Sequence, residues 1–243
     1  PLHVPAQPAP VPDIDRFYSL PSLIGTAPRG VAWAGDSRRL AFLWNDEGTN
    51  FLDVWIADVA GGAPRRVTRM PRPVMPAPST DAAVLRARTA AEQDGGVSAV
   101  QWRPAHDELL FAFRGDLWRV VPGAEPENLP KTPTSEGRAA VSPDGARVAY
   151  LREGDLWTLA LDGTAAPVRV TSLARDGVGV ESFRWSRDGR RLAVVETDRT
   201  AIRTRNIPDV LLDEARMVAQ RRAFPGEPSE TRRLGIVASN GGE

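Results

Sequence analysis

The chain has 243 residues, with 31 basic and 31 acidic side chains, and therefore carries no formal net charge. It shows no basic block or stripe, which argues against nucleic acid and anionic membranes as partners. The absence of cysteine excludes a disulfide, a thiolate metal site and a cysteine nucleophile. No apolar run reaches the length of about 18 residues that a membrane span needs.

Residues 1–25 are expected to form a lead-in that precedes any strand pattern. Its opening, Pro-Leu-His-Val-Pro-Ala-Gln-Pro-Ala-Pro-Val-Pro, is so rich in proline that an extended conformation is favoured. The segment is not a signal peptide as it stands, and it is compatible with the remnant of one that has been removed.

From residue 26 onward the sequence repeats. Tryptophan precedes a polar turn in Trp33-Ala-Gly-Asp-Ser-Arg-Arg-Leu, Trp102-Arg-Pro-Ala-His-Asp-Glu-Leu and Trp185-Ser-Arg-Asp-Gly-Arg-Arg-Leu, and Val141-Ser-Pro-Asp-Gly takes the same place. Spacings of 39 and 44 residues separate Trp102 from Val141 and Val141 from Trp185. Periods of about 40–45 residues with several short strands are typical of β-propeller blades.

Each unit reads as four antiparallel strands with tight Asp-Gly turns and a polar outer strand. The sequence therefore predicts an all-β fold, a partial WD40-like β-propeller over 26–243, with four-stranded blades at 26–69, 97–136, 137–172 and 178–238, the last of them interrupted. The tryptophans are expected to pack between blades, and a ligand-stacking platform is the alternative. Three acidic residues share one repeat position and are expected to hold hairpins: Asp53, Asp116 and Asp155.

Two segments interrupt the pattern. The insertion at 70–96 opens with prolines and continues with an alanine-rich stretch, which predicts a helix at about 80–93 with Ser79 or Thr80 as its cap. Val84 and Leu85 are the only large apolar residues of this helix, so we expect it to project from the propeller. The stretch Asp209–Gln220 looks helical by propensity.

The sequence offers little for catalysis. His3 lies in the lead-in and His106 takes a turn position, where a solvated side chain is more plausible than a catalytic base. Without a second structured histidine or a cysteine, neither a metal site nor a serine triad can readily be assembled, and no catalytic or metal-binding residue and no cofactor is predicted. Gly-Val-Ser98-Ala-Val lacks the closing glycine of a nucleophile elbow and leads into a strand.

With the units laid out, the chain resembles the N-terminal β-propeller of the dipeptidyl peptidase IV group of the prolyl oligopeptidase (S9) serine peptidase family. The resemblance rests on the opening Phe17-Tyr-Ser-Leu-Pro-Ser-Leu-Ile-Gly-Thr-Ala-Pro-Arg-Gly and on Gln220-Arg-Arg-Ala-Phe-Pro-Gly-Glu-Pro-Ser-Glu-Thr-Arg-Arg-Leu-Gly-Ile-Val. The insertion near 80–93 resembles the arm of bacterial members. The likeness begins at about residue 14.

That resemblance implies an eight-bladed propeller of which about four blades are present, so that the chain would be part of a longer polypeptide. It also implies an α/β-hydrolase domain as covalent partner, short peptides as substrates, a bacterial periplasmic or secreted location with the cytoplasm as the alternative, and a possible homodimer with the helical insertion as subunit contact. No residue of this chain matches the triad, so the chain alone is expected to be inactive.

In the family an acidic pair on a short helix holds the free amine of the substrate. The corresponding stretch here, Val178-Gly-Val-Glu-Ser-Phe-Arg-Trp, offers only Glu181, which is therefore the one candidate substrate-binding residue. An exposed Glu181 paired with Arg184 is the plainer reading. The alternative function for the whole chain is a stand-alone TolB-like propeller that binds partner proteins and catalyses nothing.

Overall fold

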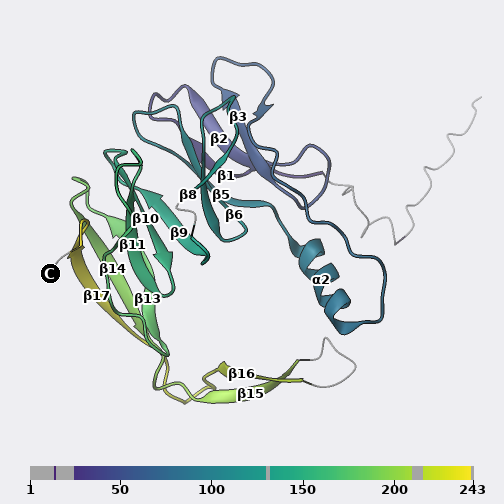
Figure 1. The fold of residues 1–243 in the computed structure, drawn as a ribbon, viewed down its shortest axis with the longest axis vertical. Helices are drawn as coiled ribbons and strands as arrows, with labels where there is room; N and C mark the ends of the chain where they lie inside the picture. The colour runs from purple at the N-terminus through teal and green to yellow at the C-terminus, as the bar shows by residue number, and fades with distance from the viewer. Residues whose placement is uncertain (1–13, 15–24, 130–131, 210–215, 242–243) are drawn as a thin grey trace, which may run out of the picture.

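The computed structural model describes residues 14, 25–129, 132–209 and 216–241. Its strands form a series of antiparallel sheets in chain order (Figure 1). The first sheet holds β1 (Arg29–Trp33), β2 (Arg39–Trp44), β3 (Asp53–Asp58) and β4 (Arg65–Arg66); the second holds β5 (Val97–Trp102), β6 (Leu109–Phe113), β7 (Asp116–Val120) and β8 (Glu127–Leu129). The third holds β9 (Glu136–Val141), β10 (Arg147–Arg152), β11 (Asp155–Ala160) and β12 (Val168–Arg169); the fourth holds β13 (Val178–Trp185), β14 (Arg191–Asp198) and β17 (Thr231–Ala238).

These sheets are called blades one to four below, and they confirm the prediction of an all-β propeller fold. Blades one to three have four strands each, as the repeat predicts. The fourth differs, because the described residues give its sheet only three strands. The division into a lead-in at 1–25 and a propeller at 26–243 stays a prediction, since most of the lead-in lies outside the described residues.

Turn chemistry sets the hairpins within each blade. The glycines of the Asp-Gly turns between the first and second strands of blades three and four, Gly145 and Gly189, have φ angles of 71° and 68°. In the hairpin between β10 and β11, both Glu153 and Gly154 have positive φ, which is the geometry of a type I′ turn. Such turns match the twist of the flanking strands, so short local sequences suffice to define each blade.

Two of the three aspartates at the shared repeat position are buried and close their blades, whereas Asp116 is half-buried and accepts a hydrogen bond from the Asn128 amide at 3.2 Å. The Asp155 carboxylate accepts hydrogen bonds from the Thr171 hydroxyl at 2.8 Å and the Leu173 amide at 2.8 Å, and it pairs with Arg169 at 2.5 Å. Asp53 repeats the arrangement with Arg66, Thr68 and Met70. Each of these two buried carboxylates thereby ties the third strand of a blade to the chain that follows its fourth strand.

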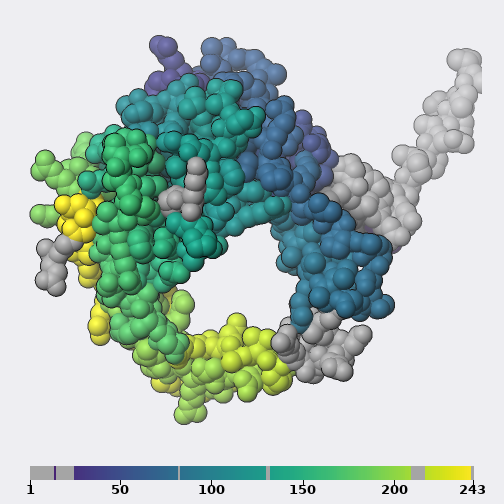
Figure 2. Space-filling view, viewed as in Figure 1, coloured from purple at the N-terminus to yellow at the C-terminus, as the bar shows by residue number. Residues whose placement is uncertain are grey.

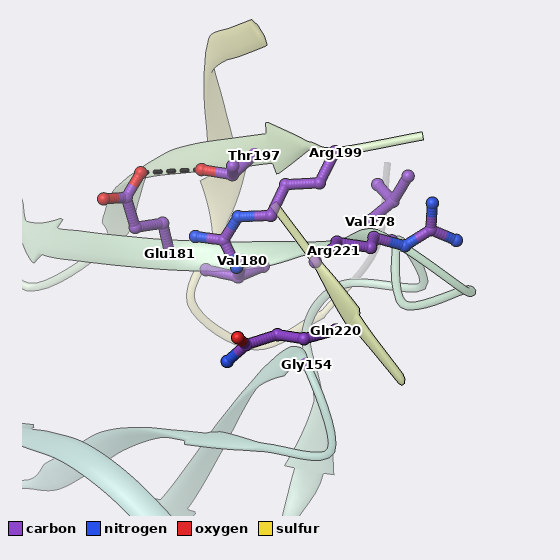
Figure 3. Close-up of a pocket in the computed structure, with 10 residues that line it drawn as sticks. Gly154, Val178, Val180, Glu181, Thr197, Arg199, Gln220 and Arg221 are labelled. Atoms are coloured by element: carbon purple, nitrogen blue, oxygen red, sulfur yellow. Dashed lines mark hydrogen bonds between the residues drawn. The ribbon is translucent and has the colours of Figure 1, made fainter. Parts of the chain in front are cut away.

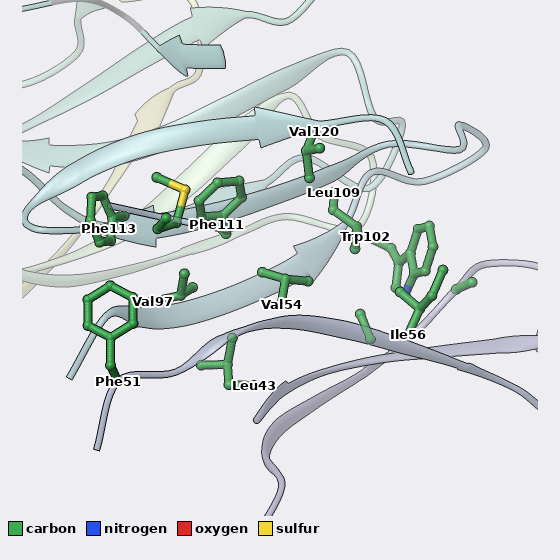
Figure 4. Packing of buried hydrophobic residues seen from close by; sticks show 13 residues of the cluster. Leu43, Phe51, Val54, Ile56, Val97, Trp102, Leu109, Phe111, Phe113 and Val120 are labelled. Atoms are coloured by element: carbon green, nitrogen blue, oxygen red, sulfur yellow. The ribbon is translucent and has the colours of Figure 1, made fainter. Parts of the chain in front are cut away.

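The hydrophobic core is divided among the contacts between blades. One cluster joins blades one and two, a second joins blades two and three, and a third joins blades three and four. Figure 4 shows the first, in which Leu43, Val54 and Ile56 of blade one face Leu109 and Phe111 of blade two. Trp102 is buried in this cluster, and Trp185 packs against the third, as expected of tryptophans between blades, whereas Trp33 is 58% exposed and departs from the expectation.

The insertion between blades one and two carries α2 (Ala82–Gln93). The predicted helix is present, but its cap is Asp81, whose carboxylate accepts from the amides of Ala83 and Val84 at 2.8 and 3.1 Å. The prediction of Ser79 or Thr80 as the cap is therefore wrong, because a carboxylate one residue later satisfies the same free amides. Figure 1 shows α2 standing away from the sheets, and no described helix is long and apolar enough to cross a bilayer.

The prediction of a helix at Asp209–Gln220 is wrong in the part that the structure describes. β16 (Arg216–Arg221) is a strand and pairs along its length with β15 (Thr204–Asp209), with Ile207 opposite Val218. The isolated helix would be short and marginal in water, and cross-strand pairing with a preceding segment overrides its weak propensity. Residues 210–215 lie outside the described residues.

The hairpin and the helix give the molecule an open, ring-like outline. The blades follow one another along an arc, and the β15–β16 hairpin leaves blade four at the far end (Figure 1). Figure 2 shows an opening bounded by the blades, the hairpin and the segment that carries α2. The hairpin thus brings the chain of blade four back toward the insertion that follows blade one.

Candidate functional site

A cleft of about 590 Å³ lies where the β15–β16 hairpin leaves blade four (Figure 3). Strands β13 and β14, the turn between β10 and β11, and strand β16 all contribute to its wall. The lining residues are Gly154, Gly177, Val178, Gly179, Val180, Glu181, Thr197, Arg199, Gln220 and Arg221. The candidate residue Glu181 is therefore in a real depression that residues distant in sequence help to build.

Glycine allows the close approach that forms this cleft. The amide of Val180 donates to the Gly154 carbonyl at 2.7 Å, which joins the β10–β11 turn to β13. A Cβ added at Gly179 would lie 3.1 Å from that same carbonyl oxygen. A side chain at Gly179 would therefore push the turn away from β13 and open the floor of the cleft.

The Glu181 carboxylate is already engaged. The Thr197 hydroxyl donates to its Oε2 at 2.6 Å, as Figure 3 shows, and Arg232 Nε donates to the same oxygen at 2.7 Å. Arg232 Nη2 reaches the other oxygen at 3.3 Å, so the contact is bidentate. The pairing with Arg184 that the sequence suggested is replaced by a partner 51 positions away in the chain.

These contacts favour the ionised form of the Glu181 carboxyl. The hydrogen bond with Arg232, followed by the one from Thr197, lowers the pKa of the Glu181 carboxyl. The same pair raises the pKa of Arg232, with Glu181 as the main cause. Both groups are therefore charged near neutrality and compensate one another.

The remaining charges of the cleft are also paired. Glu230 accepts from Arg199 Nε at 2.8 Å and also binds Arg232, which extends the Glu181 pair into a row of alternating charges. Arg221 pairs with Asp176 and donates to the Ile202 carbonyl at 3.2 Å. No charge in this row is left over to attract an ion of either sign, so the cleft is polar but electrostatically balanced.

Within the part of the chain that the structure describes, no serine is hydrogen-bonded to a histidine. His106 is exposed in a turn, with Nδ1 2.8 Å from the Pro104 carbonyl oxygen, and the Ser98 hydroxyl is directed to the Ala112 carbonyl at 3.4 Å. The described residues also contain no group of three His, Asp or Glu side chains that could hold a metal ion. His3 lies outside the described residues.

Sequence reasoning placed Glu181 but missed the arginines around it. Arg199, Arg221 and Arg232 reach the cleft from three different segments. Arg221 and Arg232 both fall in the stretch from Gln220 that carries the family resemblance, and this was the only signal that could have drawn attention to them. The stretch that corresponds to the acidic helix of the family is strand β13 in this structure.

Comparisons with known proteins found a matching family model and similar solved structures. The family model described as the dipeptidyl peptidase IV (DPP IV) N-terminal region matches residues 121–243. The crystal structure of Porphyromonas gingivalis dipeptidyl peptidase 4 is similar with a TM-score of 0.60 and 16% sequence identity, over 86% of this chain and 31% of that chain. No curated protein matches the chain.

At this identity the structural likeness supports the fold alone, and the chain spans less than a third of the length of that solved protein. The family match is the stronger evidence for the family of this chain, because it covers just over half of the chain, including blades three and four and the cleft around Glu181. The chain belongs to the family of dipeptidyl peptidase IV N-terminal regions.

Proposed function

We propose that this chain is the N-terminal propeller part of a serine peptidase of the S9 type, where it controls the access of short peptides to an α/β-hydrolase domain outside these residues. The family match over residues 121–243 carries the proposal. The blades, hairpin and insertion that surround an opening in Figure 2 support it. An opening in front of a hydrolase passes an extended peptide more easily than a folded protein.

The chemistry is assigned to the other domain. A serine nucleophile needs a base within hydrogen-bond reach, and the described residues place no histidine beside a serine. The balanced charges of the cleft suit a surface that guides or contacts a peptide without reacting with it.

A test of this assignment uses the natural polypeptide that contains these residues, beside the 243-residue chain. We expect the natural polypeptide to cleave short peptides and to react with a fluorophosphonate serine probe at a residue outside 1–243, while the 243-residue chain remains unlabelled. A natural polypeptide that neither cleaves nor reacts would favour the TolB-like alternative, a propeller that only binds proteins.

We further propose that Glu181 does not serve as a strict anchor for a free amine. A substrate ammonium would have to displace Arg232, which holds both carboxylate oxygens. Replacing a guanidinium that is already in place gains little, since the incoming ammonium must also lose its hydration. We therefore expect the full-length enzyme to accept peptides with a blocked amino terminus more readily than an enzyme with an acidic pair.

Matched free and N-acylated peptides test this expectation in the full-length enzyme. Similar kcat/KM values for the two substrates, unchanged in Glu181→Gln, are the expected result. The control is Glu153→Gln, a carboxyl in an exposed turn outside the cleft. A strong preference for the free amine that disappears in Glu181→Gln but persists in Glu153→Gln would show that Glu181 is the anchor after all.

We also propose that the protein is exported, either to the bacterial periplasm or out of the cell. This location agrees with the proline-rich lead-in and with a peptide substrate.

The projecting helix α2 is proposed as a contact in a homodimer, since Leu85 on it is 41% exposed and α2 stands apart from the blades (Figure 1).

A further inference from the structure

The β15–β16 hairpin has a free strand edge beside the cleft. In sequence it lies between β14 and β17 of blade four, yet among the described strands β15 and β16 form a two-stranded sheet of their own. Each of the two strands therefore has one edge that no other described strand occupies. Such an edge presents backbone N–H and C=O groups that another extended chain can bind.

The register of the hairpin shows which backbone groups point outward. The Arg222 amide donates to the Arg203 carbonyl at 3.1 Å, so these two residues form a hydrogen-bonded pair. Hydrogen-bonded and non-hydrogen-bonded pairs alternate along an antiparallel ladder. The non-hydrogen-bonded pairs are therefore Thr204–Arg221, Asn206–Ala219 and Pro208–Met217. In β16, the backbone N–H and C=O groups of Met217, Ala219 and Arg221 consequently point away from β15.

The two outer edges of the hairpin are not equivalent. On β15 the outward row includes Pro208, which has no N–H to donate and whose ring hinders an approaching strand. The outward row of β16 contains no proline, and residues 217–220 are all exposed. None of its three outward N–H and C=O groups is hydrogen-bonded to a described residue. The sequence thus blocks one edge of the hairpin and leaves the other able to accept a strand.

The open edge lies where a peptide would pass. In Figures 1 and 2, β16 is on the side of the hairpin toward the opening, and β15 is on the outer side. Gln220 and Arg221, at the end of β16, also line the cleft that contains Glu181 (Figure 3). A chain that paired with the outer edge of β16 would therefore follow the rim of the opening into the cleft.

The cleft end of this edge is fixed to blade four. Arg221 pairs with Asp176, and its Nη1 donates to the Ile202 carbonyl at 3.2 Å. A Cβ added at Gly177 would lie 3.2 Å from Arg221 Nε, so glycine allows the arginine to pack closely against this turn. The Gly177 carbonyl in turn accepts from the Arg199 amide at 2.7 Å. An edge that is already ordered loses little conformational freedom when a strand is added to it.

We propose that the outer edge of β16 binds the backbone of an extended peptide substrate, which adds to the hairpin as a third strand and enters the cleft beside Glu181. The assignment rests on the proposed function, which supplies the peptide. The charges that line the cleft compensate one another, so recognition through neutral backbone groups fits this site better than selection of a charged side chain. The third strand would also relieve the marginal stability of a two-stranded ribbon.

A second copy of the chain is a poorer occupant of this edge. β16 has a basic residue at each end, Arg216 and Arg221. Two antiparallel copies of β16 would bring these basic ends together, and like charges on neighbouring strands oppose pairing.

Hydrogen exchange in the natural polypeptide tests the binding directly, after its serine has been blocked with a fluorophosphonate. The probe is a short peptide rich in valine and threonine and blocked at both ends. At a peptide concentration about ten times the Kd, exchange of the Met217, Ala219 and Arg221 amides should slow about tenfold, because it then requires dissociation. The Thr204 and Asn206 amides should not change. The same peptide with alternate amides N-methylated is the control and should give no protection.

The fluorophosphonate reaction tests the proposed function separately. An unreactive polypeptide that still shows this protection would refute the peptidase function and support the peptide-binding edge. Outward amides of β16 that are protected before peptide is added would overturn the proposal and assign the edge to another part of the polypeptide. Protection that rises with protein concentration would overturn it in favour of a second copy.

Proline substitution tests the edge in catalysis. Ala219→Pro removes an outward donor from β16, and Asn206→Pro makes the same change at the residue opposite, on the outer edge of β15. Neither amide takes part in the bonds between the two strands, and circular dichroism spectra confirm that both variants are folded. In the full-length enzyme, Ala219→Pro should lower kcat/KM for the unblocked form of the peptide about tenfold, whereas Asn206→Pro should leave it unchanged. Equal kcat/KM values for the two variants would overturn the proposal.

Discussion

The turn glycines of blades three and four share a backbone conformation but not an environment. Gly145 and Gly189 both have φ near 70°, where a side chain costs about 1–2 kcal/mol. A Cβ at Gly145 would also lie 2.5 Å from the Pro104 carbonyl oxygen of blade two, whereas the nearest atom to one at Gly189 is 3.5 Å away. Local sequence predicts the turn, and only the neighbouring blade distinguishes the two glycines.

Alanine substitution should separate these two effects. Gly189→Ala is expected to lower the free energy of unfolding by about 1 kcal/mol, the conformational cost alone. Gly145→Ala should lower it by about 3 kcal/mol, because the clash with a backbone oxygen forces two blades apart. Urea unfolding of both variants is the measurement, and equal losses would contradict the close approach of Pro104 to Gly145.

The Asp155 anchor makes stability depend on pH. Burial alone would raise the pKa of this carboxyl, but hydrogen bonds from Arg169, the Leu173 amide and Thr171 outweigh burial and lower it. A lowered folded-state pKa stabilises the fold above the ordinary value of 3.8, and this contribution disappears as the pH falls through the lowered value.

We expect Asp155→Asn to lower the free energy of unfolding at neutral pH by about 2 kcal/mol, since it removes a charged acceptor from four donors. Below pH 3.8 the difference from the unchanged protein should shrink. Asp162→Asn, in an exposed turn, is the control and should show a much smaller effect at neutral pH. Unfolding curves recorded from neutral to acidic pH test this, and a constant difference at all pH values would contradict the anchor.

At the scale of elements, the repeat made the blades predictable because their signals are local. Turn residues, period-2 alternation and the anchor position all lie within a few residues of the strands that they define. The β15–β16 hairpin was not predicted, because the pairing of Ile207 with Val218 depends on a partner strand that local sequence does not reveal. The candidate site was predictable only in part. Glu181 follows from the resemblance, but its partner Arg232 lies 51 positions away in the chain and meets it only in the folded sheet.

The isolated hairpin should also be the least protected part of the sheet structure. Among the described strands, β15 and β16 pair only with one another, and Met217 and Val218 are 57% and 49% exposed. Two-stranded ribbons without a buried face are marginally stable in water. Hydrogen exchange should therefore be faster in the amides of β15–β16 than in those of β10–β11, and equal protection would indicate that a partner covers the hairpin.

For the whole molecule, the described geometry predicts that the 243-residue chain hydrolyses neither peptides nor esters. Ser98 is the serine that most resembles a nucleophile by sequence, and its hydroxyl contacts a backbone carbonyl in place of a base. Turnover by the purified chain that disappears in Ser98→Ala, and not in a control such as Ser239→Ala, would contradict this. Peptidase and esterase assays at high protein concentration are the measurement.

In β6, Leu109 and Phe111 pack toward blade one while Leu110 packs toward blade three, and this alternation limits how such a chain can change its length. One residue inserted within β6 would turn every following side chain of that strand to the opposite neighbour and damage two contacts at once. The much longer segment that carries α2 disturbs neither, because it enters between β4 and β5, where one blade has ended and the next has not begun. Insertions and deletions that this fold tolerates should therefore fall at blade junctions or add and remove entire blades.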